Sequence, residues 1–322
     1  MPELIPTILL TSLSGKKALY DTVLKQAKMF HPLARVIGAD CNANCFASHQ
    51  IQQFRVMPSL DLLGKSELLT YLARLNVTHV LPTRDGELKY WAQMADPLAR
   101  HGISVLISSF AAINFCEDKL TFSQQLLSQQ LRAIPSYLEA ENLPTKRLVI
   151  KERRSSGSRK IFIDLSKSDA LARRTLFTEP IYQPHIKGNE FTAEAWLNRE
   201  GITSSVILRW RDLVINGESH RSTVFHNALW ESSISKMLNS IKGLSGHCIS
   251  QVIVDSKQEL HLVEVNPRLG GASPLSLSAG FNSIFWSLQE EVSTGPFTPD
   301  FSPLYGAKLA KIRGQVFISL PK

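Results

Sequence analysis

Two hydrophobic periods alternate along the first third of the chain. Short aliphatic runs predict strands, and stretches with apolar residues at helical spacing lie between them. The expected strands are 6–10, 34–39, 77–81 and 103–107, and the expected helices are 18–27, 60–75 and 87–100. Strands that alternate with helices form a parallel sheet covered by helices on both faces. We therefore predict an α/β domain over residues 1–115.

The pattern changes beyond residue 115. A helix is predicted at 118–131, and short strands then follow one another without regular crossover helices. The expected strands are 147–151, 160–164, 181–184, 191–197, 205–210, 248–254 and 260–265, with helices near 231–241 and 275–285. Asp255-Ser256-Lys257-Gln258-Glu259 joins the last two strands and predicts a hairpin. This part is expected to be α+β with antiparallel sheets.

Composition excludes several classes of protein. Hydrophobic residues make up 43% of the 322 residues and charged residues 20%, which is typical of a globular chain and not of a disordered one. The four cysteines form no Cys-x-x-Cys pair and are too few for a disulfide framework, so we expect a reducing compartment. The N-terminus lacks the pattern of a secretory signal, and the charge-free stretch 269–289 is rich in serine. We therefore expect a cytoplasmic protein without a membrane span.

A net charge of +8 fits nucleic acid, an acidic membrane surface or an anionic small ligand. The window 146–160 holds seven basic residues against Glu152 alone, and small residues interrupt it. A basic loop of small residues suits phosphate. The dinucleotide pattern Gly-x-Gly-x-x-Gly is absent after the first strand, and Gly64-Lys65-Ser66 lacks the earlier glycine of a P-loop.

Oxygen donors mark the end of the last predicted strand. Strand alternation places Glu264 and Asn266 on one face, and an even hairpin centred near Lys257 brings Gln251 to the same face. One carboxylate and two amide oxygens suit Mg²⁺. Pro267 ends the strand, so Arg268 is presented at the opening of the loop. The alternative is a solvated or capping strand end without a metal.

Two further segments favour a phosphate ligand. Lys151 ends a predicted strand, and the loop from Ser155 to Ser158 offers backbone N–H groups that small side chains leave accessible. An exposed basic hairpin is the alternative. The segment 182–190 then combines a strand, a proline, a glycine turn and Glu190 at the start of the next strand.

Taken in order, these segments resemble the ATP-grasp superfamily, and most closely its carbamoyl-phosphate-synthase-like carboxylate-amine ligases. The resemblance rests on Asp118-Lys119, Lys151 with Arg153-x-Ser-Ser-Gly-Ser-Arg159, Gln183-Pro-His-Ile-Lys-Gly-Asn-Glu190, Gln251, and Glu264-x-Asn266-Pro-Arg268, and Leu81 to Leu88 is similar to the preceding domain of the family. It implies a Rossmann-like pre-ATP-grasp domain (1–115), a small lobe carrying a phosphate flap (116–182) and a large lobe carrying a metal site (183–322).

The resemblance also implies roles for individual residues. Phosphates would be bound by Lys119 and Lys151 and covered by a flap that includes Ser156, Gly157, Ser158 and Arg159. Adenine would be read by Gln183 and by the backbone of His185 and Ile186, and the ribose by Glu190. Mg²⁺ or Mn²⁺ would be held by Gln251, Glu264 and Asn266. Arg268 and Lys151 would be catalytic, with Arg268 facing the transferring phosphoryl group.

The chain departs from the family pattern in the flap and at the adenine. Glu152 stands where the flap commonly has proline, only Gly157 remains of its glycines, and Gln183 stands where glutamate is frequent. A stiffer flap is expected to affect closure more than phosphate contacts.

Candidates for substrate binding lie between the ribose glutamate and the metal hairpin, or directly after it. They are Arg209, Arg211, His220 and Arg221 on a strand and the loop that follows, and Gly270 and Gly271 beyond Arg268. Arginine side chains bind carboxylates through paired hydrogen bonds. Ordinary surface roles for the four cations are an equal alternative.

The predicted function is ATP-dependent activation of a small carboxylate as an acyl phosphate, for attack by an amine. An amino-acid or peptide-like substrate is favoured. A regulatory ATP-binding module without turnover and a basic nucleic-acid-binding protein are the alternatives. The expected partners are ATP, the carboxylate and the amine, without nucleic acid or membrane, and a homodimer is possible.

Overall fold

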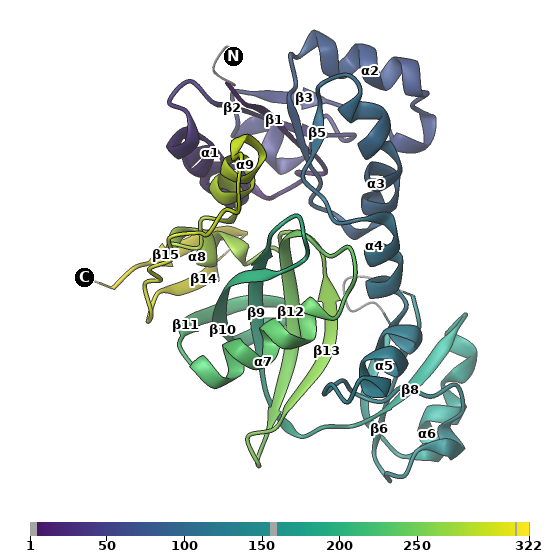
Figure 1. Cartoon of the computed structure of the whole chain (residues 1–322). Helices are drawn as coiled ribbons and strands as arrows, with labels where there is room; N and C mark the ends of the chain where they lie inside the picture. The colour runs from purple at the N-terminus through teal and green to yellow at the C-terminus, as the bar shows by residue number, and fades with distance from the viewer. Residues whose placement is uncertain (1–4, 155–159, 313, 322) are drawn as a thin grey trace.

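The computed structural model describes residues 5–154, 160–312 and 314–321. Three sheets organise the chain (Figure 1). The N-terminal sheet lies at the top of the view, the large antiparallel sheet in the centre, and a small sheet at the lower right. Within the described residues, no helix has the length and hydrophobicity needed to cross a membrane.

Five parallel strands form the N-terminal sheet in the order β3-β2-β1-β4-β5. The strands are β1 (Thr7–Leu10), β2 (Arg35–Asp40), β3 (Phe54–Val56), β4 (His79–Leu81) and β5 (Ser104–Val105), and the helices are α1 (Lys17–Phe30), α2 (Lys65–Arg74), α3 (Asp85–Ala99) and α4 (Phe110–Glu117). Separate cores join α1 to one face and α2 with α3 to the other, so the predicted doubly covered sheet is confirmed. Because strand order reverses between β1 and β4, the loops after these two strands flank a crevice.

Local details of this domain differ from the sequence prediction. The helix expected over 60–75 is a 3₁₀ turn at Leu60–Leu62 followed by α2. The helix starts after Gly64 because the Glu67 carboxylate accepts the Gly64 N–H at 2.9 Å. Strand β3 was not predicted, since three residues are too few to show a period. Helix α4 was also missed, and it spans the predicted boundary at residue 115.

A three-stranded antiparallel sheet, ordered β7-β6-β8, forms the next unit. Its elements are α5 (Lys119–Ser128), β6 (Leu148–Glu152), β7 (Ile161–Leu165), α6 (Lys167–Ala172) and β8 (Pro180–Pro184). Strand β6 is central, so its last residues are held by partners on both sides: Lys151 is opposite Ile161 and Ile181.

The large sheet has the order β13-β12-β9-β10-β11-β14-β15 and is antiparallel throughout. Its strands are β9 (Gly188–Leu197), β10 (Thr203–Ile215), β11 (Glu218–Phe225), β12 (Gly246–Asp255), β13 (Leu260–Asn266), β14 (Lys308–Ile312) and β15 (Gln315–Ser319). One face packs against α4, α5 and α7 (Ala228–Asn239). The other packs against α8 (Ser273–Ser278) and α9 (Ser283–Val292), and its uncovered part faces the N-terminal domain.

Two predictions for the C-terminal half were wrong, one for the sheet and one for the helices that cover it. The residues after Trp210 are not a loop: β10 continues to Ile215 and turns through Asn216-Gly217, both at positive φ, into β11. An Asn-Gly pair between apolar runs is the sequence signal of this hairpin. The helix expected over 275–285 is two helices, because Gly280 adopts a φ of +97° that ends α8.

Helices α8 and α9 join the C-terminal half to the N-terminal domain. Their residues Leu277, Ile284 and Leu288 belong to the same core as Ile8 and Leu19. Figure 1 shows α9 beside α1, although the two helices are far apart in the sequence. This packing holds the loops after β1 and β4, which flank the crevice of the N-terminal sheet, above the end of β13.

Candidate active site

Two buried lysines from different elements lie close enough to influence each other's charge. Lys119 begins α5 and Lys151 lies in β6, and their exposed fractions are 6% and 5%. The pKa of Lys151 is lowered to about 8. Burial is the main cause and the nearby Lys119 adds to it, while Glu264 and Glu190 act in the opposite direction. A lysine, a second lysine and two carboxylates from four elements therefore share one electrostatic environment. This convergence agrees with the predicted phosphate and metal residues.

This pKa gives a test. We expect the affinity for a non-hydrolysable ATP analogue to fall above pH 8, because Lys151 is protonated below that pH and loses its charge above it. The fall is at most about tenfold per pH unit. Calorimetric titrations from pH 7 to 10 measure it, and Lys151→Arg, which stays charged, is the control. Equal pH dependence in both proteins would contradict the assignment.

The residues that lead into the predicted flap, Arg153 and Arg154, are anchored to α5. Asp118 caps that helix by accepting the Thr121 N–H at 3.2 Å, and it also binds Arg153 at 2.6 and 2.7 Å and Arg154 at 2.6 Å. Burial alone would raise the pKa of Asp118, but these bonds and charges hold it at about 2. The predicted flap residues Ser156, Gly157, Ser158 and Arg159 lie outside the described residues.

The predicted adenine residues form one end of the small sheet. Gln183 is buried, and its amide nitrogen donates to Ser136 Oγ at 2.8 Å, which leaves Oε1 as its acceptor. The N–H of His185 donates to the Arg147 carbonyl at 3.0 Å. If the backbone here reads an adenine edge, as the sequence predicts, the His185 carbonyl and Ile186 are the groups available for it.

Glu190 is the third residue of β9, the first strand of the large sheet in chain order. Its carboxylate lies 3.1 Å from Arg211 Nε, and burial raises its pKa, with Glu264 adding to the effect and Arg211 opposing it. The residue is thus near both the lysine pair and the metal strip, as the predicted ribose contact requires.

The oxygen-donor strip forms, but not through the predicted even hairpin: five residues separate Val254 from its partner Leu260, and a bulge at Val263 shifts the register. Gln251 on β12 is directly opposite Glu264 on β13, and Asn266 follows on the same face. Asn266 Nδ2 donates to Glu264 Oε1 at 2.9 Å, so the amide turns its oxygen away from the carboxylate. All three side chains line one cavity. A carboxylate and two amide oxygens fit Mg²⁺ or Mn²⁺, with ligand positions left for phosphate oxygens.

This cavity has a volume of about 520 Å³ and lies between the large sheet and the N-terminal crevice. Basic side chains outnumber acidic ones among its lining residues: Lys16, Arg84, Arg209, Arg211, His220, Arg268 and Lys311 against Asp85, Glu218 and Glu264. The predicted Gly270 and Gly271 also line it. Ser14 to Lys16 and Thr83 to Asp85 enter from the loops after β1 and β4, as an open parallel sheet requires.

Arg221 does not reach this cavity and is exposed. The register of β10 and β11 skips His220, because Leu213 is opposite Arg221 and Val214 is opposite Ser219. The resulting bulge directs His220, and not Arg221, to the cavity. A bulge of this kind has no period in the sequence.

Arg209 lines the cavity from within the sheet. It is 3% exposed, its Nε donates to Glu194 Oε1 at 2.7 Å, and a terminal nitrogen donates to Ser222 Oγ at 3.3 Å. Glu194 is fully buried and also lies 3.1 Å from His247. This buried network orients Arg209, and no local pattern in the sequence predicts it.

Two functional candidates were missed at the sequence level. Lys16 donates to the Ser12 and Thr83 carbonyls at 2.9 and 3.1 Å, and burial lowers its pKa to about 8, with Arg268 adding to the effect. Lys311 pairs with Glu218 at 2.8 Å on the opposite wall. Neither stands in a motif, because both reach the cavity only through folding.

The two glycines after Arg268 give a second test. A Cβ on Gly270 would lie 2.6 Å from Ile249 Cδ1, whereas one on Gly271 would lie 3.2 Å from the flexible end of Lys311. We expect Gly270→Ala to destabilise the fold by about 1–3 kcal/mol through overpacking. Gly271→Ala is the matched control and is expected to change stability little. Urea denaturation of both variants checks this, and equal losses would contradict it.

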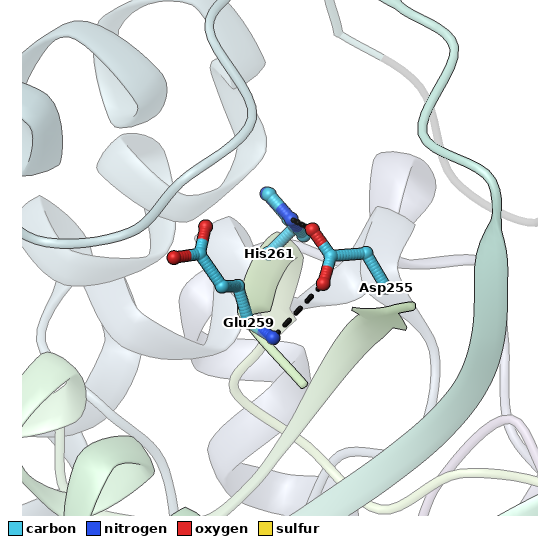
Figure 2. A group of neighbouring side chains, drawn as sticks. All are labelled: Asp255, Glu259 and His261. Carbon is cyan, nitrogen blue, oxygen red and sulfur yellow. Dashed lines mark hydrogen bonds and ion pairs between the residues drawn. The ribbon is translucent and has the colours of Figure 1, made fainter. Parts of the chain in front are cut away.

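A separate acidic cluster lies at the tip of the β12–β13 hairpin. Figure 2 shows Asp255 bonded both to His261, at 2.9 Å, and to the Glu259 N–H, at 3.0 Å. These three residues have ligand atoms close enough for a metal ion. Glu259, however, pairs with Arg132 at 2.7 Å, and Asp255 accepts the backbone N–H of Lys257 in the turn. The cluster therefore holds the hairpin against the chain that follows α5.

Comparison with known proteins agrees with this geometry. Residues 116–272 match the family model of the ATP-grasp domain. Among curated proteins, none matches the sequence. The chain therefore carries an ATP-grasp domain, as the sequence motifs predicted.

Solved structures share the fold over nearly the whole chain. The biotin carboxylase domain of 2-oxoglutarate carboxylase from Hydrogenobacter thermophilus has a TM-score of 0.73 at 13% identity, covering 96% of this chain and 75% of that one. An L-amino acid ligase from Bacillus licheniformis scores 0.69 at 14% identity, covering 95% and 79%. N5-carboxyaminoimidazole synthetase from Staphylococcus aureus scores 0.68 at 15% identity, covering 95% and 82%.

Proposed function

We propose that this protein uses ATP to activate a small carboxylate as an acyl phosphate, which an amine then converts to an amide. The observation that carries the proposal is the shared electrostatic environment of Lys119, Lys151, Glu190 and Glu264, the last of which also lines a basic cavity. The match to the ATP-grasp domain supports ATP as the nucleotide. The rest of the cavity offers space for a second, anionic substrate.

In the first step, a carboxylate oxygen attacks the γ-phosphorus of ATP and the bond to the β,γ-bridging oxygen breaks, releasing ADP. Lys119 and Lys151 neutralise phosphate charge, which lowers the barrier mainly by positioning and electrostatics. Gln251, Glu264 and Asn266 would hold Mg²⁺, which supplies further neutralisation of phosphate charge when bound. The H. thermophilus structure holds MgADP and bicarbonate, which supports this assignment.

In the second step, the amine nitrogen attacks the carbonyl carbon of the acyl phosphate. Phosphate leaves with the electrons of the C–O bond, and the amine proton passes to solvent. Arg268, which lines the cavity beside the metal strip, would stabilise the phosphoryl charge in both steps. The similarity to an L-amino acid ligase supports an amino-acid or peptide-like carboxylate.

The basic window of the sequence does not form a free cationic surface among the described residues. Arg147 pairs with Asp164 at 2.7 Å, Arg153 and Arg154 pair with Asp118, and Lys151 is buried. This pairing favours a small anionic ligand over a nucleic acid.

The test is formation of ADP and hydroxamate with Mg²⁺, ATP, a panel of amino acids and other small carboxylic acids, and hydroxylamine as the amine. Hydroxamate formed with one acid confirms acyl-phosphate chemistry and identifies the carboxylate. ATP binding without ADP from any acid would favour the regulatory module. Glu264→Gln is the control for turnover at this site.

A further inference from the structure

We propose that Asp85 of the N-terminal domain is a positioning residue that holds Arg268 in its working orientation. This inference rests on the proposed function, because it assigns Arg268 to the phosphoryl group. Asp85 lies outside the segment that matches the ATP-grasp family model, which begins at residue 116. The N-terminal domain would thus supply part of the active site.

The two side chains form a bidentate pair at the wall of the cavity. Arg268 Nε donates to Asp85 Oδ1 and Nη2 donates to Asp85 Oδ2, both at 2.5 Å. Exposed fractions of 18% and 23% place the pair at the cavity wall and not at the outer surface. Paired bonds of this kind fix the plane of a guanidinium as well as its position.

The bonding pattern leaves donors for a ligand. Arg268 carries five N–H groups, and a third one donates from Nη1 to the Leu269 carbonyl at 3.0 Å. Among the described residues, no acceptor is bonded to the remaining two, one on each terminal nitrogen. Asp85 therefore fixes one edge of the guanidinium, and two further donors of this cavity-lining residue are left for a ligand.

Asp85 is itself held by a rigid segment. It is the first residue of α3, and the buried Glu87 carboxylate accepts the N–H groups of Thr83 and Arg84 at 2.9 and 3.0 Å. Trp91 Nε1 also donates to Glu87, at 3.3 Å. The start of α3 is thus built around a buried acceptor, which limits movement of Asp85.

Lys16 connects this segment to the neighbouring strand. Its ammonium binds the carbonyl and hydroxyl of Thr83 at 3.1 and 2.9 Å, and Thr83 Oγ1 donates to the Thr11 carbonyl at 2.7 Å. The ends of β1 and β4 are thereby tied together beneath Asp85. This gives Lys16 a role as the support of the pair, although it stands in no motif.

The experiment measures turnover and ATP binding for the full chain with Asp85→Asn, Arg268→Ala and the double variant. An asparagine accepts one bond from Arg268 but repels the other donor and removes the charge. We expect Asp85→Asn to lower kcat for ADP formation about ten- to a hundredfold with the Kd for ATP unchanged within twofold. In the Arg268→Ala background, the same change is expected to have no further effect.

Asp21→Asn is the matched control, since Asp21 pairs with Lys17 at 2.5 Å on the exposed face of α1 in the same domain. Unchanged or increased turnover in Asp85→Asn would overturn the proposal, the latter because Asp85 would then compete with substrate for Arg268. Equal losses with and without Arg268 would overturn it too.

A second measurement separates this inference from the proposed function. The Nε–H signal of Arg268, identified by its loss in Arg268→Lys, is expected to be protected from solvent exchange in the parent protein and unprotected in Asp85→Asn. An unprotected signal in the parent protein would overturn the pair. Failure of every acid to yield ADP would refute the ligase proposal while this signal still reports on the pair.

Discussion

Replacing Lys151 with methionine is expected to lower ADP formation by about two to three orders of magnitude while the protein keeps its fold. The ammonium is buried beside Lys119 and Glu264, so with ATP bound as proposed its charge would act on phosphate with little solvent screening. Methionine fills similar space without the charge, and burial of the neutral side chain costs less than burial of the ammonium.

The measurement is steady-state ADP formation with saturating Mg²⁺ and whichever carboxylate the hydroxamate assay identifies, together with circular dichroism to check folding. Lys146→Met is the matched control, because Lys146 is exposed and precedes the same strand. A variant at Lys151 that retains turnover within a few-fold of the parent would remove this residue from the phosphate site.

Replacing Glu194 with glutamine is expected to reduce the free energy of unfolding by about 3–5 kcal/mol, because it leaves Arg209 buried without its counter-charge. Glu194 is 0% exposed and contacts Arg209 at 2.7 Å and His247 at 3.1 Å. Urea denaturation followed by tryptophan fluorescence suits this test, since Trp196 and Trp286 are buried in the same half of the molecule.

The loss should depend on pH. Burial opposes ionisation of Glu194, but Arg209 and His247 hold its pKa at about 2, below the ordinary value of 4.5. The stabilising contribution is therefore complete above pH 4.5 and is lost as the pH falls towards 2. Parent and Glu194→Gln stabilities are expected to converge over that range.

Glu218→Gln is the matched control, because Glu218 is 66% exposed in its pair with Lys311. Its effect on the free energy of unfolding is expected to be below about 1 kcal/mol. A similar loss in both variants, or a constant difference between parent and Glu194→Gln from pH 6 to pH 3, would contradict the role given to the buried network.

The sequence predicted most elements of the fold, because hydrophobic period is a local property. It failed where an element is short, as in β3, or where a bulge shifts the register, as at His220. The hairpin at Asn216-Gly217 did carry a local signal, and with it β11 is predictable.

The sequence alone determined the order of the chemical groups and their local geometry. Gln251 comes opposite Glu264 only through a bulge in β13, but Glu264 and Asn266 share a face because strand alternation requires it, and Lys151 ends an apolar strand in any fold that buries it. These relations span few residues, so local sterics and turn geometry are sufficient to set them.

Only the tertiary structure decided what surrounds these groups. The Arg268–Asp85 pair joins residues 183 positions apart, and α8 and α9 must first pack on the N-terminal domain to bring its crevice over the end of β13. Lys16 and Arg209 gain their environments in the same way. Such contacts depend on which buried faces complement one another across the whole chain, and no periodicity within a segment contains that information.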